Sequence, residues 1–311
     1  MFSKFSNDFE SRGSGIAKNA PKKKGLMLFF EIFIRKFWKL LQVNMLYTVF
    51  FIPLLIILVA ISFIYENMPV ALTLCGIMLV LFVATIGPAT AGMTKVMRNY
   101  VLEKHSFIVH DFFRAFKANF KKASLIGFID CFIMLSVYAS FVVYPILAKQ
   151  SGTKLMYIPM VITLSLAIVV MMMNYYIYLM LIATNLSFKN LVKNSFALAF
   201  VAMKNNIITF AVNAVVIVGM ALLYIYMRYL FFMLIPFVPS AFLCFVTCFN
   251  SYPVIQKYVI NPYYASMGKI NPELVNETPS DDISEEVICE DMGGKEKPIG
   301  KRKKTKGRRI S

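Results

Sequence analysis

Residues 155–188 read LMYIPMVITLSLAIVVMMMNYYIYLMLIATNLSF, a run that contains no Asp, Glu, Lys or Arg. About 20 apolar residues are enough for a helix to cross the roughly 30 Å hydrocarbon core of a bilayer. Lipid offers the backbone no hydrogen-bond partners, so such a segment must satisfy its own N–H and C=O groups, which a helix does. This stretch therefore predicts a membrane-spanning helix.

Five further runs of similar length surround it. Residues 123–148 are broken only by Asp130, and four others carry no charge at all: 40–65, 67–94, 205–227 and 229–256. We therefore expect an all-α, polytopic membrane helix bundle with six transmembrane helices and amphipathic helices on the cytoplasmic side. The expected spans cover about 43–65, 70–92, 123–147, 157–183, 206–227 and 230–254.

Composition and charge agree with this fold class and give it an orientation. The chain is 59% hydrophobic and 16% charged, whereas a soluble protein is nearer half apolar and a quarter charged. If the first span leads outward, only three of the 33 Lys and Arg residues fall in outer loops, namely Lys149, Lys154 and Arg228. Because cytoplasmic loops are enriched in Lys and Arg, we expect both termini in the cytoplasm.

The two ends of the chain differ from the membrane domain, which we place at 26–264. Residues 1–25 are polar and basic, and residues 265–311 are too polar to fold alone, so we expect both segments to be disordered. In the tail an acidic stretch, 273–291, precedes a basic one, 295–309. Such a basic run can contact anionic lipid, and the lack of interleaved aromatic residues argues against nucleic acid.

Three amphipathic segments adjoin the spans, at 26–39, 111–122 and 188–204, with Phe residues on one side and Lys or Arg on the other. One interpretation is a threefold repeat of an amphipathic helix followed by a hairpin, and the other is that any hairpin protein needs interfacial connectors. Each Phe face can lie on the lipid surface, against the protein itself, or on the cytoplasmic loops of a partner. Anionic lipid headgroups are the expected partners of the basic side.

Catalytic signatures are missing from the sequence. The only two histidines, His105 and His110, are not spaced as helical metal ligands, and no phosphate-binding loop, nucleophile motif or paired intramembrane carboxylates occur. We therefore expect no catalytic, cofactor-binding or metal-binding residues and no enzyme activity.

Asp130 and Gly87-Pro88 are the two features inside the spans that suggest a function. An ionisable residue in hydrocarbon is costly, so Asp130 is a candidate functional residue, with pairing to Lys95, Lys121 or Lys122 as the structural alternative. Proline removes one helical hydrogen bond, so Gly87-Pro88 should break or kink the second span.

The stretch that follows resembles a known family. GPATAG at 87–92, RNYV at 98–101 and DFFRAFKANFK at 111–121 are similar to the YesL-like family of uncharacterised bacterial integral membrane proteins. The resemblance extends over about 28–260 and implies a similar size and span number. With Asp130, it makes these residues functional or structural candidates: Gly87, Pro88, Asp111, Phe112, Phe113, Phe116 and Asn119.

Genes of that family often lie beside genes for carbohydrate ABC transporters, so the resemblance implies an accessory role in carbohydrate uptake. The first hypothesis is a non-enzymatic membrane protein that contacts ABC transporter membrane subunits. The alternative is a transporter or channel that uses Asp130 and the broken second span. A membrane enzyme is the third and least favoured hypothesis.

Overall fold

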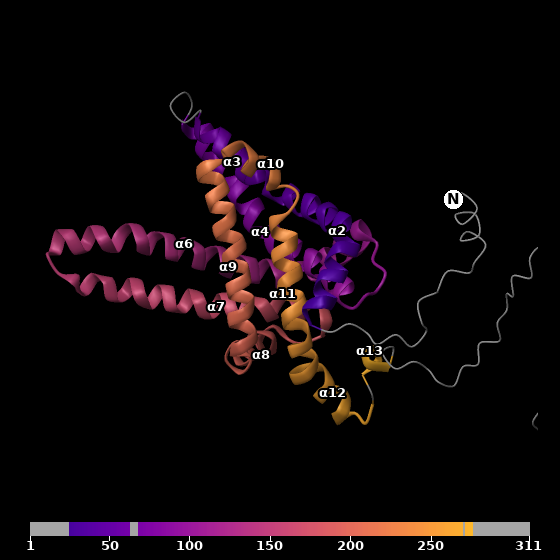
Figure 1. Cartoon of the computed structure of the whole chain (residues 1–311). Helices are drawn as coiled ribbons and strands as arrows, with labels where there is room; N and C mark the ends of the chain where they lie inside the picture. The colour runs from indigo at the N-terminus through magenta and orange to yellow at the C-terminus, as the bar shows by residue number, and fades with distance from the viewer. Residues whose placement is uncertain (1–24, 63–67, 270, 276–311) are drawn as a thin grey trace, which may run out of the picture. The chain divides into compact units, whose positions relative to one another are not determined.

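The computed structural model describes residues 25–62, 68–269 and 271–275, and these contain helices but no strand. The expectations for 1–24 and for the charge-segregated tail from 276 onward lie outside the described residues. The chain divides into two compact units, Met1–Tyr263 and Tyr264–Ser311. The described part of the second unit holds the end of α12 and the short α13 (Pro272–Val275), and the remaining helices belong to the first unit (Figure 1).

The first unit is a series of helices joined by short connections. Its first part contains α2 (Leu26–Thr48), a 3₁₀ turn (Val49–Phe51), α3 (Ile52–Ser62), α4 (Met68–Val101), α5 (Ile108–Ala118) and α6 (Phe120–Ser151). Its second part contains a 3₁₀ turn (Lys154–Met156), α7 (Tyr157–Ala183), α8 (Phe188–Val201), α9 (Met203–Tyr226), α10 (Arg228–Leu234), α11 (Pro239–Ile255), a π-helical turn (Gln256–Ile260) and α12 (Asn261–Ser266).

The lengths of these helices fit a bilayer. Five described helices are long and apolar enough to cross one: Leu26–Ile61, Met68–Val101, Phe120–Ser151, Lys154–Ala183 and Met203–Tyr226. The pair formed by α10 and the helix that begins at Pro239 is bent by 59° and gives a sixth crossing if it is one broken span. The expected all-α membrane helix bundle is confirmed, and the protein is a multi-pass membrane protein.

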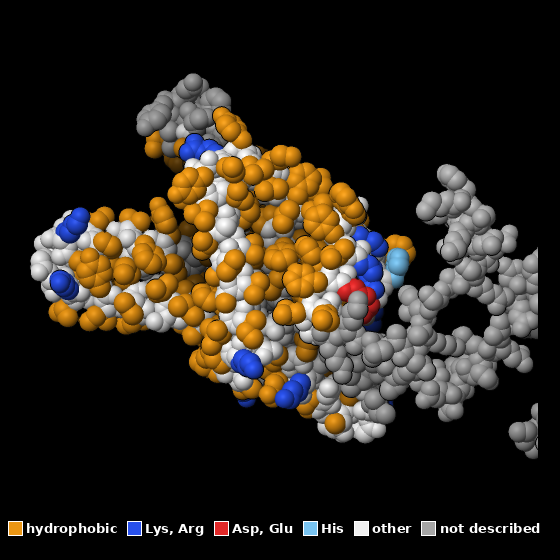
Figure 2. Space-filling view, in the orientation of Figure 1, with side chains coloured by type: hydrophobic (Ala, Val, Ile, Leu, Met, Phe, Trp, Pro, Cys, Tyr) orange, Lys and Arg blue, Asp and Glu red, His pale blue; other side chains and the backbone are white. Residues whose placement is uncertain are grey.

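Helices α6 and α7 form a long hairpin that extends away from α9 and α11 in Figure 1. Its turn contains Gly152, whose φ of 66° is the left-handed conformation that glycine adopts readily after a helix. Figure 2 shows basic side chains at the free end of the hairpin, where the sequence has Lys149 and Lys154, and hydrophobic side chains over much of its length. In the most apolar part of α7 no residue is buried by the rest of the protein, so lipid is the expected surrounding of this part.

The buried part of the hairpin is its base. Ala123, Ile126 and Gly127 at the start of α6 are buried, and so is the segment 175–181 near the end of α7. The base packs on α4 and α11.

Candidate functional site: the α4–α5–α6 junction and the Asp130 cluster

Gly87 lies at a very close contact between α4 and α6. A Cβ atom added to Gly87 would lie 2.0 Å from the backbone oxygen of Ala123, and one added to Gly127 would lie 2.8 Å from the backbone nitrogen of Gly87. Any side chain at either position would force the backbones apart. The two glycines therefore set the contact between these helices, as small residues do in membrane proteins.

The sequence predicted a break or a kink at Gly87-Pro88, and helix α4 shows no break there. It is helical from Met68 to Val101, with Pro88 inside. Proline cannot donate to the carbonyl four residues earlier, which is that of Ala84. The hydroxyl of Ser124 on α6 donates to this carbonyl at 2.7 Å. A side chain from the neighbouring helix thus replaces the missing backbone donor, and the helix continues.

The start of α5 packs just as closely on α4. Gly92 is buried, and a Cβ there would lie 2.9 Å from the backbone oxygen of Phe112. The Phe112 side chain is fully buried, and its ring stacks on that of Phe50 with centroids 5.9 Å apart. Phe116 stacks on the same ring at 5.3 Å. Phe112 and Phe116 therefore pack within the protein, whereas Phe120, at the end of the same face, is exposed.

Phe113 and Asn119 complete this junction. Phe113 is half-buried and contacts Phe112 and Phe116 edge to face. Asn119 connects α5 with α6: its side-chain amide donates to the carbonyl of Ala115 at 3.1 Å, and its own carbonyl accepts from the N–H of Ala123 at 2.8 Å. The two helices are thereby joined through one residue.

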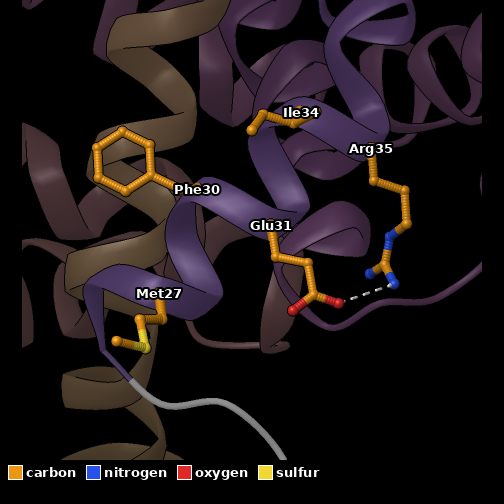
Figure 3. Close-up of a pocket in the computed structure, with 5 residues that line it drawn as sticks. All are labelled: Met27, Phe30, Glu31, Ile34 and Arg35. Carbon is orange, nitrogen blue, oxygen red and sulfur yellow. Dashed lines mark ion pairs between the residues drawn. The ribbon is translucent and has the colours of Figure 1, made fainter. Parts of the chain in front are cut away.

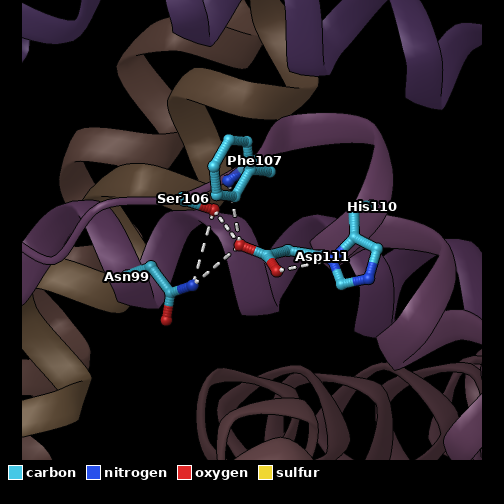
Figure 4. A network of polar contacts seen from close by, with 5 residues as sticks. All are labelled: Asn99, Ser106, Phe107, His110 and Asp111. Carbon is cyan, nitrogen blue, oxygen red and sulfur yellow. Dashed lines mark hydrogen bonds and ion pairs between the residues drawn. The ribbon is translucent and has the colours of Figure 1, made fainter.

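A polar network around Asp111 closes the loop between α4 and α5 (Figure 4). One carboxylate oxygen accepts from the hydroxyl of Ser106 at 2.6 Å, the backbone N–H of Phe107 at 3.1 Å and the amide of Asn99 at 3.5 Å. The other lies 3.4 Å from Nδ1 of His110. Partial burial raises the pKa of Asp111, but the hydrogen bonds from Ser106, His110 and Phe107 outweigh it, so the pKa lies below its usual value.

The same loop is tied to α2. After α4 the chain turns at Glu103, which has a φ of 54°, an uncommon value for a residue other than glycine. Its carboxylate pairs with Arg35 at 2.5 Å, and Arg35 also lies 3.9 Å from Glu31. The Glu31–Arg35 pair borders an open groove on α2 together with Met27, Phe30 and Ile34 (Figure 3). The loop between α4 and α5 is thus held by Asp111 of α5 and by Arg35 of α2.

Asp130 lies apart from this junction, on the face of α6 that meets α7. The amide of Asn174 donates to one carboxylate oxygen at 2.7 Å, and the hydroxyl of Tyr178 donates to the other at 3.0 Å. We call these three residues the Asp130 cluster. The partners of the carboxylate in the structure are neutral groups of the next span, whereas the sequence had suggested Lys95, Lys121 or Lys122 as the alternative.

Comparison with known proteins adds one match. Residues 40–141 match a protein family described as "Protein of unknown function, DUF624". This is the family that includes the YesL-like proteins, and the match is shorter than the expected 28–260. No curated protein and no solved structure matches the chain. The matched segment contains the whole α4–α5–α6 junction and Asp130, but neither Asn174 nor Tyr178.

Two polar residues important to the packing could not be recognised from the sequence. Asn44 is fully buried in α2; its amide donates to the carbonyl of Ile235 at 3.0 Å and accepts from the N–H of Ala241 at 2.8 Å. Asn44 thus provides hydrogen bonds to two backbone groups at the interruption between α10 and α11. Ser124 has the same kind of role at Pro88. The only indication in the sequence was that Asn44 and Ser124 are polar residues inside apolar runs. That pattern does not predict which groups they bind.

Proposed function

We propose that the protein is a non-enzymatic accessory protein of the bacterial cell membrane that contacts the membrane subunits of an ABC-type carbohydrate uptake system from the cytoplasmic side. The matched family carries no known function, so the proposal draws on the geometry and on the resemblance to YesL-like proteins. Both termini and the α4–α5 loop face the cytoplasm in this proposal.

One observation carries the proposal. The motif residues of the α4–α5–α6 junction are packed against one another, and they hold α5 with its Phe face inward and its basic side outward. Arg114, Lys117 and Lys121 are exposed, and we call them the basic face. A rigid element that presents cations beside a membrane suits contact with acidic groups of a partner or with anionic lipid headgroups.

Affinity purification in mild detergent tests this function. The tagged full chain should bring down membrane subunits of a carbohydrate transporter, and replacing the three residues of the basic face by Glu should abolish this. A matched control replaces the same number of cations elsewhere, at Lys149, Lys154 and Arg228, and should retain the partner. If the wild-type chain purifies without any transporter subunit, the proposed role is wrong.

A transporter or channel is the second candidate, and the Asp130 cluster favours it. An intramembrane carboxylate is a frequent element of proton and ion pathways. The uninterrupted α4 removes the broken second span from this hypothesis. Reconstitution in liposomes with candidate solutes tests it, and an unchanged flux in Asp130→Asn would exclude Asp130 as the coupling residue.

A further inference from the structure

The position of Asp130 along α6 puts its carboxylate inside the hydrocarbon core. At 1.5 Å per helical residue it lies about 12 Å from Lys122 and about 28 Å from Lys149. A core of roughly 30 Å centred between these two lysines includes it. Its partners Asn174 and Tyr178 lie one helical turn apart on α7, so both point at the carboxylate from the neighbouring span.

Among the described residues, the groups that interact with Asp130 include oxygen and nitrogen donors but no cation. The titratable groups that interact with it are Tyr178, Tyr47 of α2 and Cys131 of its own helix. The hydroxyl of Tyr47 in turn lies 3.1 Å from that of Thr90 on α4. Ordinary tyrosine and cysteine side chains are neutral at pH 7. A bare carboxylate in a medium of low dielectric is expensive unless a cation or a proton neutralises it.

The three residues can accommodate both states of the carboxyl group. When it is ionised, the amide and the hydroxyl donate to its two oxygens. When it is protonated, its O–H can donate to the amide oxygen of Asn174 after the amide rotates by a half turn, while Tyr178 continues to donate. An amide carries both donors and an acceptor, which makes this exchange possible without moving a helix.

We propose that Asp130, Asn174 and Tyr178 form an intramembrane binding site for a small monovalent cation, either a proton or Na⁺. One carboxylate neutralises one positive charge, whereas sites for divalent cations collect more oxygen ligands and usually more acidic groups. Asp130 is the only acidic residue within the apolar runs between residues 67 and 256. The site holds whether or not the chain moves solutes, and it does not depend on the accessory function.

Carbodiimide labelling of the full-length protein in lipid nanodiscs tests the site. Dicyclohexylcarbodiimide reacts with protonated carboxyl groups in apolar surroundings, and mass spectrometry identifies the labelled residue. We expect Asp130 to be labelled at acidic pH and progressively less as the pH rises. Protection by NaCl but not by choline chloride at fixed pH would identify Na⁺ as a ligand, and dependence on pH alone would identify the proton.

Two variants separate binding from folding. Tyr178→Phe removes one donor to the ionised carboxylate, so the labelling rate at a given alkaline pH should rise by about tenfold. Tyr138→Phe alters an exposed tyrosine on α6 and should leave the rate unchanged. The proposal is overturned if wild-type Asp130 stays unlabelled at every pH, or if its labelling responds to neither pH nor Na⁺.

Discussion

Gly87 shows at the scale of one residue what the sequence can and cannot predict. The Gly87-Pro88 pair predicted a break or a kink in the helix. The structure instead uses Gly87 for a close approach to Ala123 and repairs the proline defect through Ser124. Ala123 and Ser124 both lie on α6, whereas Gly87 and Pro88 lie on α4. The sequence could therefore point to Gly87-Pro88 as unusual, but it could not predict what the pair does, because that depends on contacts with another helix.

Gly87→Ala should destabilise the protein. The added Cβ would lie 2.0 Å from the oxygen of Ala123, so the helices must separate, and overpacking of this kind costs about 1–3 kcal/mol. Gly76→Ala is the matched control in the same helix, since nothing lies within 4 Å of its Cβ position. Thermal unfolding in detergent should show a lower midpoint for Gly87→Ala alone. Equal midpoints for the two variants would disprove the close crossing.

Ser124→Ala should weaken α4 at its proline. The carbonyl of Ala84 would lose its donor, and a buried group without a partner costs about 1–3 kcal/mol. Ser136→Ala on the same helix removes only a bond to the carbonyl of Phe132 within the helix and serves as control. Hydrogen exchange around Pro88 should speed up in the first variant and stay unchanged in the second. Unchanged exchange in both would mean that Ser124 does not support the helix.

The stability of the α4–α5 loop should depend on pH through Asp111. The pKa of Asp111 is lowered in the folded protein, so the native contacts favour the ionised form. Their contribution is fully present above about pH 5, well above the ordinary aspartate pKa of about 3.9, and is lost as the pH falls through the lowered folded value. Limited proteolysis of the loop should accelerate on acidification, and Asp111→Asn should be cleaved rapidly at neutral pH too. A rate independent of pH in the wild type would contradict this role.

At the scale of elements, apolar runs predicted which segments become helices, whereas the ends and breaks followed from tertiary contacts. The last apolar run is interrupted at residues 235–238, between α10 and α11, where Pro236 lies and directly before Pro239. What stabilises the interruption could not be predicted, because Asn44 lies 191 residues from Ile235 in the sequence. Asn174 and Asn44 are both asparagines within apolar runs. Asn174 donates to the carboxylate of Asp130, whereas Asn44 binds backbone groups of Ile235 and Ala241.

Asn44→Leu should loosen the connection between α10 and α11. It removes the partners of the Ile235 carbonyl and the Ala241 N–H at a buried position, a loss of about 2 kcal/mol. Gln42→Leu changes an exposed amide in the same helix and should have no effect. Hydrogen exchange of the Ala241 amide measures the difference directly. Slow exchange at Ala241 in Asn44→Leu would show that this amide does not depend on Asn44.

At the scale of the whole molecule, hydropathy predicted a multi-pass helix bundle, and the described helices bear this out with five crossings, or six if the bent pair is one. The direction in which the α6–α7 hairpin extends from α9 and α11 (Figure 1) could not be predicted, because the contacts at its base join residues far apart in the sequence. An even number of crossings puts the two ends of the membrane domain on one side, and an odd number puts them on opposite sides. The basic face follows the second crossing, so it lies on the same side as the start of the membrane domain whatever the total count.

Mapping three epitope tags in intact cells and in inverted vesicles tests the arrangement most directly. The tags are placed at the N-terminus, at Gly152 in the exposed hairpin turn, and at the C-terminus. We expect antibody to reach the Gly152 tag from outside and both terminal tags only in inverted vesicles. Terminal tags on opposite sides, or a Gly152 tag on the same side as the N-terminus, would contradict six crossings with a cytoplasmic basic face.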